Sequence, residues 1–134
     1  MIVRDFHESD LEGEWAEGVG ANEIRHDILR MTVVDEETVV AIGGITLDRD
    51  VPLFWMQVKK GIKHTLTLMK MIKDGMNIIL EQLSFIRAYA LLRTGFEQGR
   101  RTLKLLGFKP TGESMEYDNI IYDWYEIWHS YPHY

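Results

Sequence analysis

The apolar residues change their spacing several times along the chain, and each change marks an expected element. Residues 1–5 are typical of a short strand, and Ser9 is a suitable N-cap for a helix that ends near residues 18–20. Asn22 can cap a second, shorter helix that reaches Leu29. The pattern therefore predicts one strand and two helices before residue 30.

Three extended segments are expected next. Residues 31–35 and 38–47 are rich in Val, Ile and Thr and are separated by an acidic turn, which is the pattern of a β-hairpin. A second turn at 48–50 leads into a strand at 53–58. Together these segments predict an antiparallel meander.

Helices and strands alternate in the second half of the chain. Between residues 64 and 83, apolar side chains recur every three or four positions, which predicts a helix with one buried face. Because this helix lies between two expected strands, those strands should be parallel neighbours. The other expected elements are a strand at 84–92, a helix at 94–106 closed by Gly107, and strands at 109–117 and 120–128.

Length and composition are those of one globular domain, which we take to span residues 1–134. The chain has no cysteine, so disulfides and thiolate chemistry are excluded. It has 21 acidic and 15 basic residues, and this net charge of −6 argues against a nucleic-acid partner. No apolar run reaches the roughly 18 residues of a membrane span, and no secretory signal begins the sequence. We therefore expect a cytoplasmic protein with no membrane partner.

Three local sequences are similar to signature stretches of one fold family. Residues 39–45 (VVAIGGI) are a glycine-containing strand, and residues 55–63 (WMQVKKGIK) run from a strand into a basic loop before a helix. Residues 102–108 (TLKLLGF) end a late helix. In this order they resemble the GNAT (Gcn5-related N-acetyltransferase) superfamily. The compact layout also resembles small GNAT-like proteins of short-tailed bacteriophages, among them internal virion proteins.

The resemblance sharpens the expected architecture. It implies an α/β, single-domain GNAT-like fold, with a mixed, mostly antiparallel sheet of about six to seven strands flanked by about four helices. In this family acetyl-CoA lies in a V-shaped opening between the fourth and fifth strands. Its pantetheine pairs with the fourth strand, and its pyrophosphate rests on the loop that follows.

The resemblance also implies which residues would bind acetyl-CoA. The fourth strand is 53–58, and the loop 59–65 adds positive charge from its lysines and histidine. A solvated basic helix start would have the same composition. The candidate cofactor-binding residues are Met56, Val58, Lys59, Lys60, Gly61, Ile62, Lys63, His64, Thr65 and Phe96.

The sequence departs from the family pattern at its catalytic positions. The family's frequent asparagine corresponds to Phe96, and its frequent acid tyrosine corresponds to Leu103. Neither register of the loop around Gly61 fits the family's glycine pattern. Acetyl transfer to an amine needs a base for the ammonium and an acid for the leaving thiolate. The candidate substitutes are Tyr89 as the acid and Glu97 or His26 as the base; strand packing, helix capping and a surface histidine are the structural alternatives.

Aromatic residues are concentrated at the C-terminus. They are Tyr117, Tyr122, Trp124, Tyr125, Trp128, Tyr131 and Tyr134. A strand at 120–128 would carry apolar side chains on both faces, so it is either sandwiched or part of an interface. We expect a homo-oligomer or a protein partner at this hairpin. The five histidines have no metal-ligand spacing, so no metal is expected.

Two hypotheses about function follow. The first is an acetyl-CoA-dependent N-acetyltransferase that transfers acetyl directly to an amine of a protein or small molecule. The second is a catalytically inactive GNAT-like phage protein, a virion component or host-interaction factor, that acts through protein–protein contacts. An open groove between strands 53–58 and 85–90 would favour the enzyme. A groove that is paired throughout, or filled by Phe96 or Lys63, would contradict it.

Overall fold

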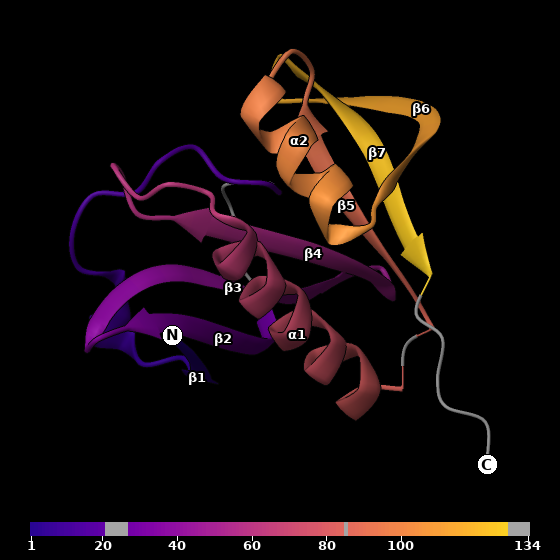
Figure 1. Ribbon diagram of the computed structural model, residues 1–134. Helices are drawn as coiled ribbons and strands as arrows, with labels where there is room; N and C mark the ends of the chain where they lie inside the picture. The colour runs from indigo at the N-terminus through magenta and orange to yellow at the C-terminus, as the bar shows by residue number, and fades with distance from the viewer. Residues whose placement is uncertain (21–26, 85, 129–134) are drawn as a thin grey trace.

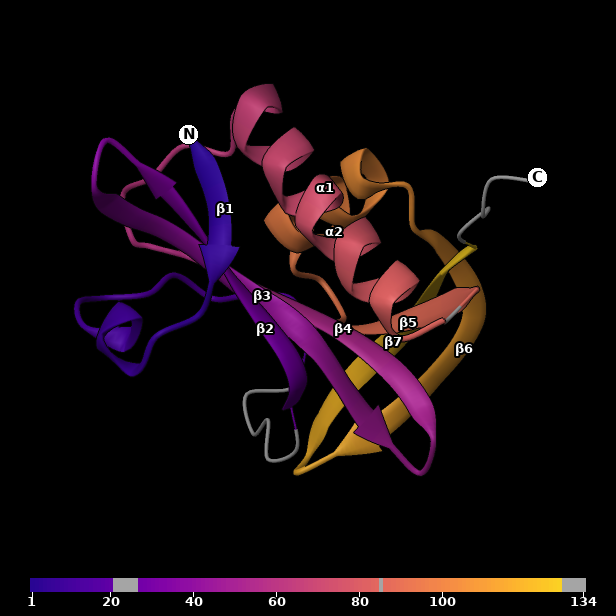
Figure 2. The ribbon, with the colours of Figure 1, turned by 90° about the horizontal axis from the view of Figure 1, so that it is seen from below.

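A mixed seven-stranded sheet forms the centre of the structure, a computed structural model that describes residues 1–20, 27–84 and 86–128. Two α-helices pack on the same side of this sheet (Figures 1 and 2). The elements are β1 (Ile2–Asp5), a short 3-10 turn η1 (Glu8–Leu11), β2 (Asp27–Asp35), β3 (Thr38–Asp48), β4 (Val51–Val58), α1 (Leu66–Gln82), β5 (Arg87–Arg93), α2 (Glu97–Leu106), β6 (Lys109–Tyr117) and β7 (Ile120–Trp128).

The strands lie in the order β1-β2-β3-β4-β5-β7-β6. Every neighbouring pair is antiparallel except β4 and β5, which are parallel and joined through α1. The predicted parallel crossover is therefore confirmed. The β4–β5 pair holds only one register position, Leu53 opposite Tyr89, and the two strands diverge from there (Figure 1).

Three tight hairpin turns define the register of the antiparallel pairs. Each has two consecutive residues with positive φ, as in the type I′ turn that suits the twist of a hairpin. All three lie where the sequence predicts turns. The residue pairs are Glu36 and Glu37, Arg49 and Asp50, and Asp118 and Asn119.

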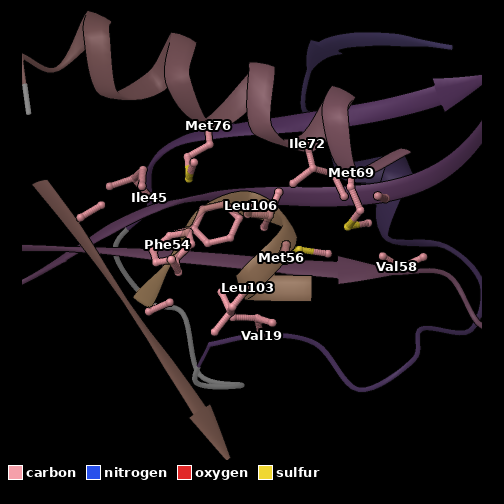
Figure 3. Close-up of a cluster of buried hydrophobic side chains, with 14 of the residues drawn as sticks. Val19, Ile45, Phe54, Met56, Val58, Met69, Ile72, Met76, Leu103 and Leu106 are labelled. Atoms are coloured by element: carbon pink, nitrogen blue, oxygen red, sulfur yellow. The ribbon is translucent and has the colours of Figure 1, made fainter. Parts of the chain in front are cut away.

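The predicted apolar face of the first long helix is confirmed. Leu68, Ile72, Met76 and Ile79 of α1 are buried in one cluster with the inner face of β2–β5 and with α2 (Figure 3). Gly75 also faces the sheet, where an added Cβ would lie 3.3 Å from a methyl of Val3. The glycine thus lets α1 approach β1.

The two N-terminal helices are the main error of the sequence prediction. Only the four-residue turn η1 forms where a helix was expected over residues 9–18. Gly13, with a φ of 100°, interrupts this segment. The segment also contains closely spaced acidic residues, which would repel one another in a helix. The second expected helix ends inside β2, and its residues 22–26 lie outside the described residues. The described chain therefore has two α-helices instead of about four.

Smaller differences concern element ends. The strand expected from residue 84 begins at Arg87, since Ser84 has a φ of 58° and belongs to a turn. The helix expected from residue 94 begins at Glu97, and Gly107 closes it with a φ of 100°, as predicted. Neither described helix has the length and apolar character needed to cross a membrane.

A buried carboxylate fixes η1 to the sheet. The side chain of Asp10 is 3% exposed and accepts two hydrogen bonds from the Arg4 guanidinium, at 2.9 and 2.7 Å. The backbone N–H of His7 and the hydroxyl of Thr32 also donate to it, at 2.8 and 2.7 Å. The Arg4 guanidinium holds the pKa of Asp10 well below its usual range, outweighing burial, which raises it. β1, β2 and η1 therefore meet at one charged group.

We expect Asp10→Asn to lower the free energy of unfolding by roughly 2–3 kcal/mol near neutral pH, because Arg4 loses its charged partner. Since the pKa of Asp10 is lower in the folded than in the unfolded state, its stabilisation is complete above about pH 4 and is lost as the pH falls below that value. Urea unfolding near neutral pH and under acid conditions measures both effects. The variant should lose less stability on acidification than the wild type. Glu12→Gln, at an exposed neighbouring carboxylate, is the control and should change neither quantity.

Candidate functional site

The divergence of β4 from β5 creates the V-shaped opening that the family resemblance predicts. The strands pair at Leu53 and Tyr89, so the opening lies between the second half of β4 and the second half of β5. We call this opening the wedge. Met56 and Val58 are the β4 residues whose backbone groups face it, because both bond to chain segments on that side.

The wedge is occupied by the chain itself. Residues 14–20, which we call the strap, run antiparallel to β4 and bridge it to β5 (Figure 1). Five backbone hydrogen bonds of 2.9–3.0 Å hold the strap. They run from Ala16 N–H to Val58 C=O, from Val19 N–H to Met56 C=O, from Met56 N–H to Val19 C=O, from Lys60 N–H to Glu14 C=O, and from Gly20 N–H to Leu91 C=O.

Two glycines allow this close approach. A Cβ at Gly18 would lie 2.3 Å from the carbonyl oxygen of Met56, and a Cβ at Gly20 would lie 2.7 Å from the Cβ of Trp55. Both distances are shorter than contacts that real side chains make. Only glycine at these two positions therefore lets the strap pair with β4.

Side chains secure the strap at its centre and on both banks of the wedge. Val19 is 4% exposed and belongs to the same core cluster as Leu103 of α2 (Figure 3). Glu17 accepts two hydrogen bonds from Arg93 of β5, at 2.8 and 2.9 Å. On the β4 side, the carboxylate of Glu14 lies 3.7 Å from Nζ of Lys60, and Nζ of Lys59 lies 5.5 Å from the centre of the Trp15 ring.

Sequence reasoning missed the strap because it assigned these residues to a helix. The sequence signal that could have revealed it is Gly18-Val19-Gly20, in which one apolar residue stands between two residues without side chains. Such a triplet fits a strand that must lie close to another backbone.

The residues expected to bind acetyl-CoA divide between the core and one exposed loop. Met56 and Val58 are each 2% exposed, and their wedge-facing carbonyl groups are bonded to the strap. The loop from Lys59 to Thr65 connects β4 to α1, with Gly61 at its tip in a left-handed conformation and Ile62 packed against the core. Lys60 and Lys63 are exposed, so this loop remains cationic on its outer side.

Two polar contacts order the end of this loop. The hydroxyl of Thr65 accepts a hydrogen bond from the backbone of Leu68 and so caps α1. Nδ1 of His64 lies 3.1 Å from the hydroxyl of Thr102 on α2, and that hydroxyl donates to the carbonyl of Gln98. Nδ1 must therefore carry the proton of this contact. Burial lowers the pKa of His64, which favours the neutral ring.

The candidate catalytic residues do not converge. Tyr89 lies on the sheet face away from the helices, where its ring meets Trp124 edge-on at 5.9 Å. Glu97 is exposed on α2, on the other side of the sheet, and its ion pair with Arg100 lowers its pKa. His26 lies outside the described residues.

The two family positions that lost their polar groups are structural in this chain. Phe96 is the N-cap of α2 and packs partly buried against the core, with Arg93 over its ring at 5.4 Å. Leu103 is fully buried in that core. Within the described ranges, no group of three or more His, Cys, Asp or Glu residues could hold a metal ion.

Comparison with known proteins gives a clear result for structure only. No protein-family model and no curated protein sequence matches the chain. Among solved structures, the GNAT-family acetyltransferase from Streptococcus pneumoniae superposes with a TM-score of 0.63 at 11% identity, over 76% of this chain and 66% of that protein. The ribosomal-protein-S5-alanine acetyltransferase from Vibrio fischeri gives a TM-score of 0.63 at 13% identity, over 75% and 61%.

A third match covers more of this chain. The ribosomal-protein-S18-alanine N-acetyltransferase from Escherichia coli superposes with a TM-score of 0.58 at 9% identity, over 93% of this chain and 76% of that protein. The chain spans slightly less than two thirds of the length of the Streptococcus and Vibrio proteins. These likenesses establish that the chain has the GNAT fold, as its sequence predicts.

We expect Gly18→Ala to detach the strap and to lower the free energy of unfolding by several kcal/mol, because the new Cβ overlaps the Met56 carbonyl and the contacts of the strap are lost with it. The amides of Val19 and Met56, which bond across the wedge, should then exchange hydrogen faster. Amide exchange followed by NMR is the measurement. Gly61→Ala is the matched control, since its Cβ would meet no atom within 4 Å. It should cost only about 1 kcal/mol of backbone strain and leave exchange at Met56 unchanged. Slow exchange at Met56 in Gly18→Ala would contradict the steric argument.

Proposed function

We propose that this chain is a GNAT-fold protein without acetyltransferase activity that acts through protein–protein contacts. One observation carries the proposal: the strap bonds to the β4 backbone groups that pantetheine would need. A bound strap and a bound cofactor cannot use those groups together. The resemblance to small phage proteins fits such a role, either in a virion or in contact with a host protein.

The strap is a strong competitor for the wedge. Each of its five backbone hydrogen bonds contributes about 1 kcal/mol, and burial of the Val19 side chain adds about 2 kcal/mol. Because the strap is part of the chain, its effective concentration at the wedge is also high. A cofactor would have to displace all of these contacts before it could bind.

The chemistry of the site supports the same conclusion. Tyr89 and Glu97 lie on opposite sides of the sheet, so they cannot act on one substrate. The position of the family's acid tyrosine is the buried Leu103.

A second candidate is an acetyl-CoA-dependent N-acetyltransferase that acts on an amine of a protein or small molecule. The divergence of β4 from β5 and the cationic loop after β4 favour it. It requires the strap to withdraw so that pantetheine can pair with β4. The pyrophosphate would then lie beside Lys63 and the N-terminus of α1.

The aromatic face of the C-terminal sheet is the proposed contact surface. Arg87 lies between the rings of Tyr89 and Trp128, 4.9 and 4.5 Å from their centres, and forms an ion pair with Glu126. Trp128 is 59% exposed. Exposed Trp, Tyr and Arg side chains held in fixed positions are the residue types that dominate binding at protein interfaces. A homo-oligomer or another protein would use this surface.

Calorimetric titration of the wild-type protein with acetyl-CoA separates the two functions. We expect no binding up to millimolar cofactor and no acetylation of a panel of polyamines, amino-terminal peptides and lysine peptides. Micromolar binding would instead support the enzyme. In that case Lys63→Glu should weaken binding at least tenfold, while Lys73→Glu, an exposed lysine of α1, should leave it unchanged.

Replacement of Trp128 tests the contact surface. We expect Trp128→Ser to reduce self-association in sedimentation equilibrium, or to abolish binding of a partner that the wild-type protein retains. The variant should keep its stability because the side chain is mostly exposed. Leu105→Ser, at a leucine of α2 that is 50% exposed, is the matched control. Equal effects of the two substitutions would argue against the aromatic face.

A further inference from the structure

The strap is bounded by backbone positions that permit large rotations. Gly13 precedes it and Gly20 ends it, with φ of 100° and 102°. Glycine occupies this left-handed region and many others at little cost, and hinged segments use such positions to absorb changes in φ and ψ. These two glycines are therefore the positions about which the chain would rotate if the strap left the wedge.

The strap is held in the way that a groove holds a bound peptide. Val19 is the only one of its residues that is fully buried; the others are half-buried or exposed. In peptide recognition by strand addition, backbone hydrogen bonds supply affinity and a few side-chain pockets supply specificity. In the strap, the five backbone bonds and the buried side chain of Val19 have these two roles.

Each bank of the wedge carries a cation that pairs with a glutamate of the strap. Arg93 on the β5 bank holds Glu17 through two parallel N–H···O bonds, a geometry that guanidinium groups favour with carboxylates. Lys60 on the β4 bank faces Glu14 at 3.7 Å. If the strap left, both cations would face the opening without these carboxylates.

From these contacts we infer that the wedge is a binding site for an extended acidic segment of a partner protein, which replaces the strap by strand addition. The inference rests on the proposed function, since it requires a wedge that is not a cofactor site. The segment takes glycine at the positions of Gly18 and Gly20, a small aliphatic residue at Val19, and carboxylates at Glu14 and Glu17. The strap then occupies the wedge until the partner segment binds and displaces it.

Binding of a synthetic strap peptide tests this inference. The probe is a dye-labelled peptide of residues 12–20 (EGEWAEGVG), followed by fluorescence anisotropy with the full-length chain. We expect the Gly18→Ala protein, whose own strap is displaced, to bind the probe at least tenfold more tightly than the wild type. Gly61→Ala, which keeps its strap, should match the wild type. If Gly18→Ala does not fold, Val19→Ser replaces it, because this change removes the buried side chain without enlarging the strap.

Altered peptides test the specificity. A probe with alanine at the position of Gly18 should bind at least tenfold more weakly, because its Cβ would overlap the Met56 carbonyl. A probe with lysine at the positions of Glu14 and Glu17 should also bind at least tenfold more weakly. Equal binding of all three probes would overturn the inference.

The remaining outcomes separate this inference from the proposed function. No saturable binding to a variant whose Met56 amide exchanges rapidly would overturn the inference alone. Acetyl-CoA that displaces the probe from the variant, but does not bind the wild type, would also overturn it, since the wedge would then be a latent cofactor site. Acetyl-CoA that binds the wild type would overturn the proposed function as well.

Discussion

The hydrogen-bonding requirement of β4 organises this molecule. β4 lies near the centre of the sheet, yet it leaves β5 after one register position, so the backbone of its second half has no strand partner on that side. Unpaired backbone groups in a protein interior are costly, and the side chains of Met56 and Val58 are almost fully buried. In the family that the chain resembles, pantetheine meets this requirement. Here residues 14–20 meet it, and the chain supplies its own partner for the strand.

Most of the fold follows from local pattern. The sequence predicts the meander, the crossover helix and the final hairpin. Their apolar patterns extend over many residues, and their turns fall at acidic or polar pairs such as Asp118 and Asn119. The N-terminal region was mispredicted for a physical reason. Ser9 and the acidic residues after it suit the start of a helix, but Gly13 stops one. The free edge of β4 and the loop after it form four hydrogen bonds with the rest of the segment, and β5 adds a fifth. Pairing with the edge of a strand that is distant in the sequence outweighed the local propensity for a helix. The local sequence pattern does not show where such an edge will be unpaired.

The location of the candidate site was predictable, but its occupation by the strap was not. The family resemblance implied an opening between the fourth and fifth strands, where β4 and β5 do diverge, and the sequence put the cationic loop directly after β4. The groups proposed from the sequence to fill the wedge were the side chains of Phe96 and Lys63. The wedge is instead filled by the backbone of the strap and the side chain of Val19. The sequence likewise identified the missing polar groups at Phe96 and Leu103, and both are packed in or against the core. It could not determine that Tyr89 and Glu97 lie on opposite faces, because that depends on the pleat of β5 and the side on which α2 packs.

The glycines of the strap also change where this chain should tolerate substitution. In a GNAT enzyme that binds phosphate, small residues are needed in the loop after the fourth strand, where Gly61 has open space around it in this chain. Here the tight positions are Gly18 and Gly20, which lie 43 and 41 residues before Gly61 in the sequence. Among chains that keep their wedge filled in this manner, we expect substitution to be more frequent at residue 61, where only the left-handed φ disfavours a side chain, than at residues 18 and 20, where a Cβ would also overlap β4. Two glycines at this spacing before the second strand would then distinguish chains whose own strap fills the wedge from chains of the same fold whose wedge is open.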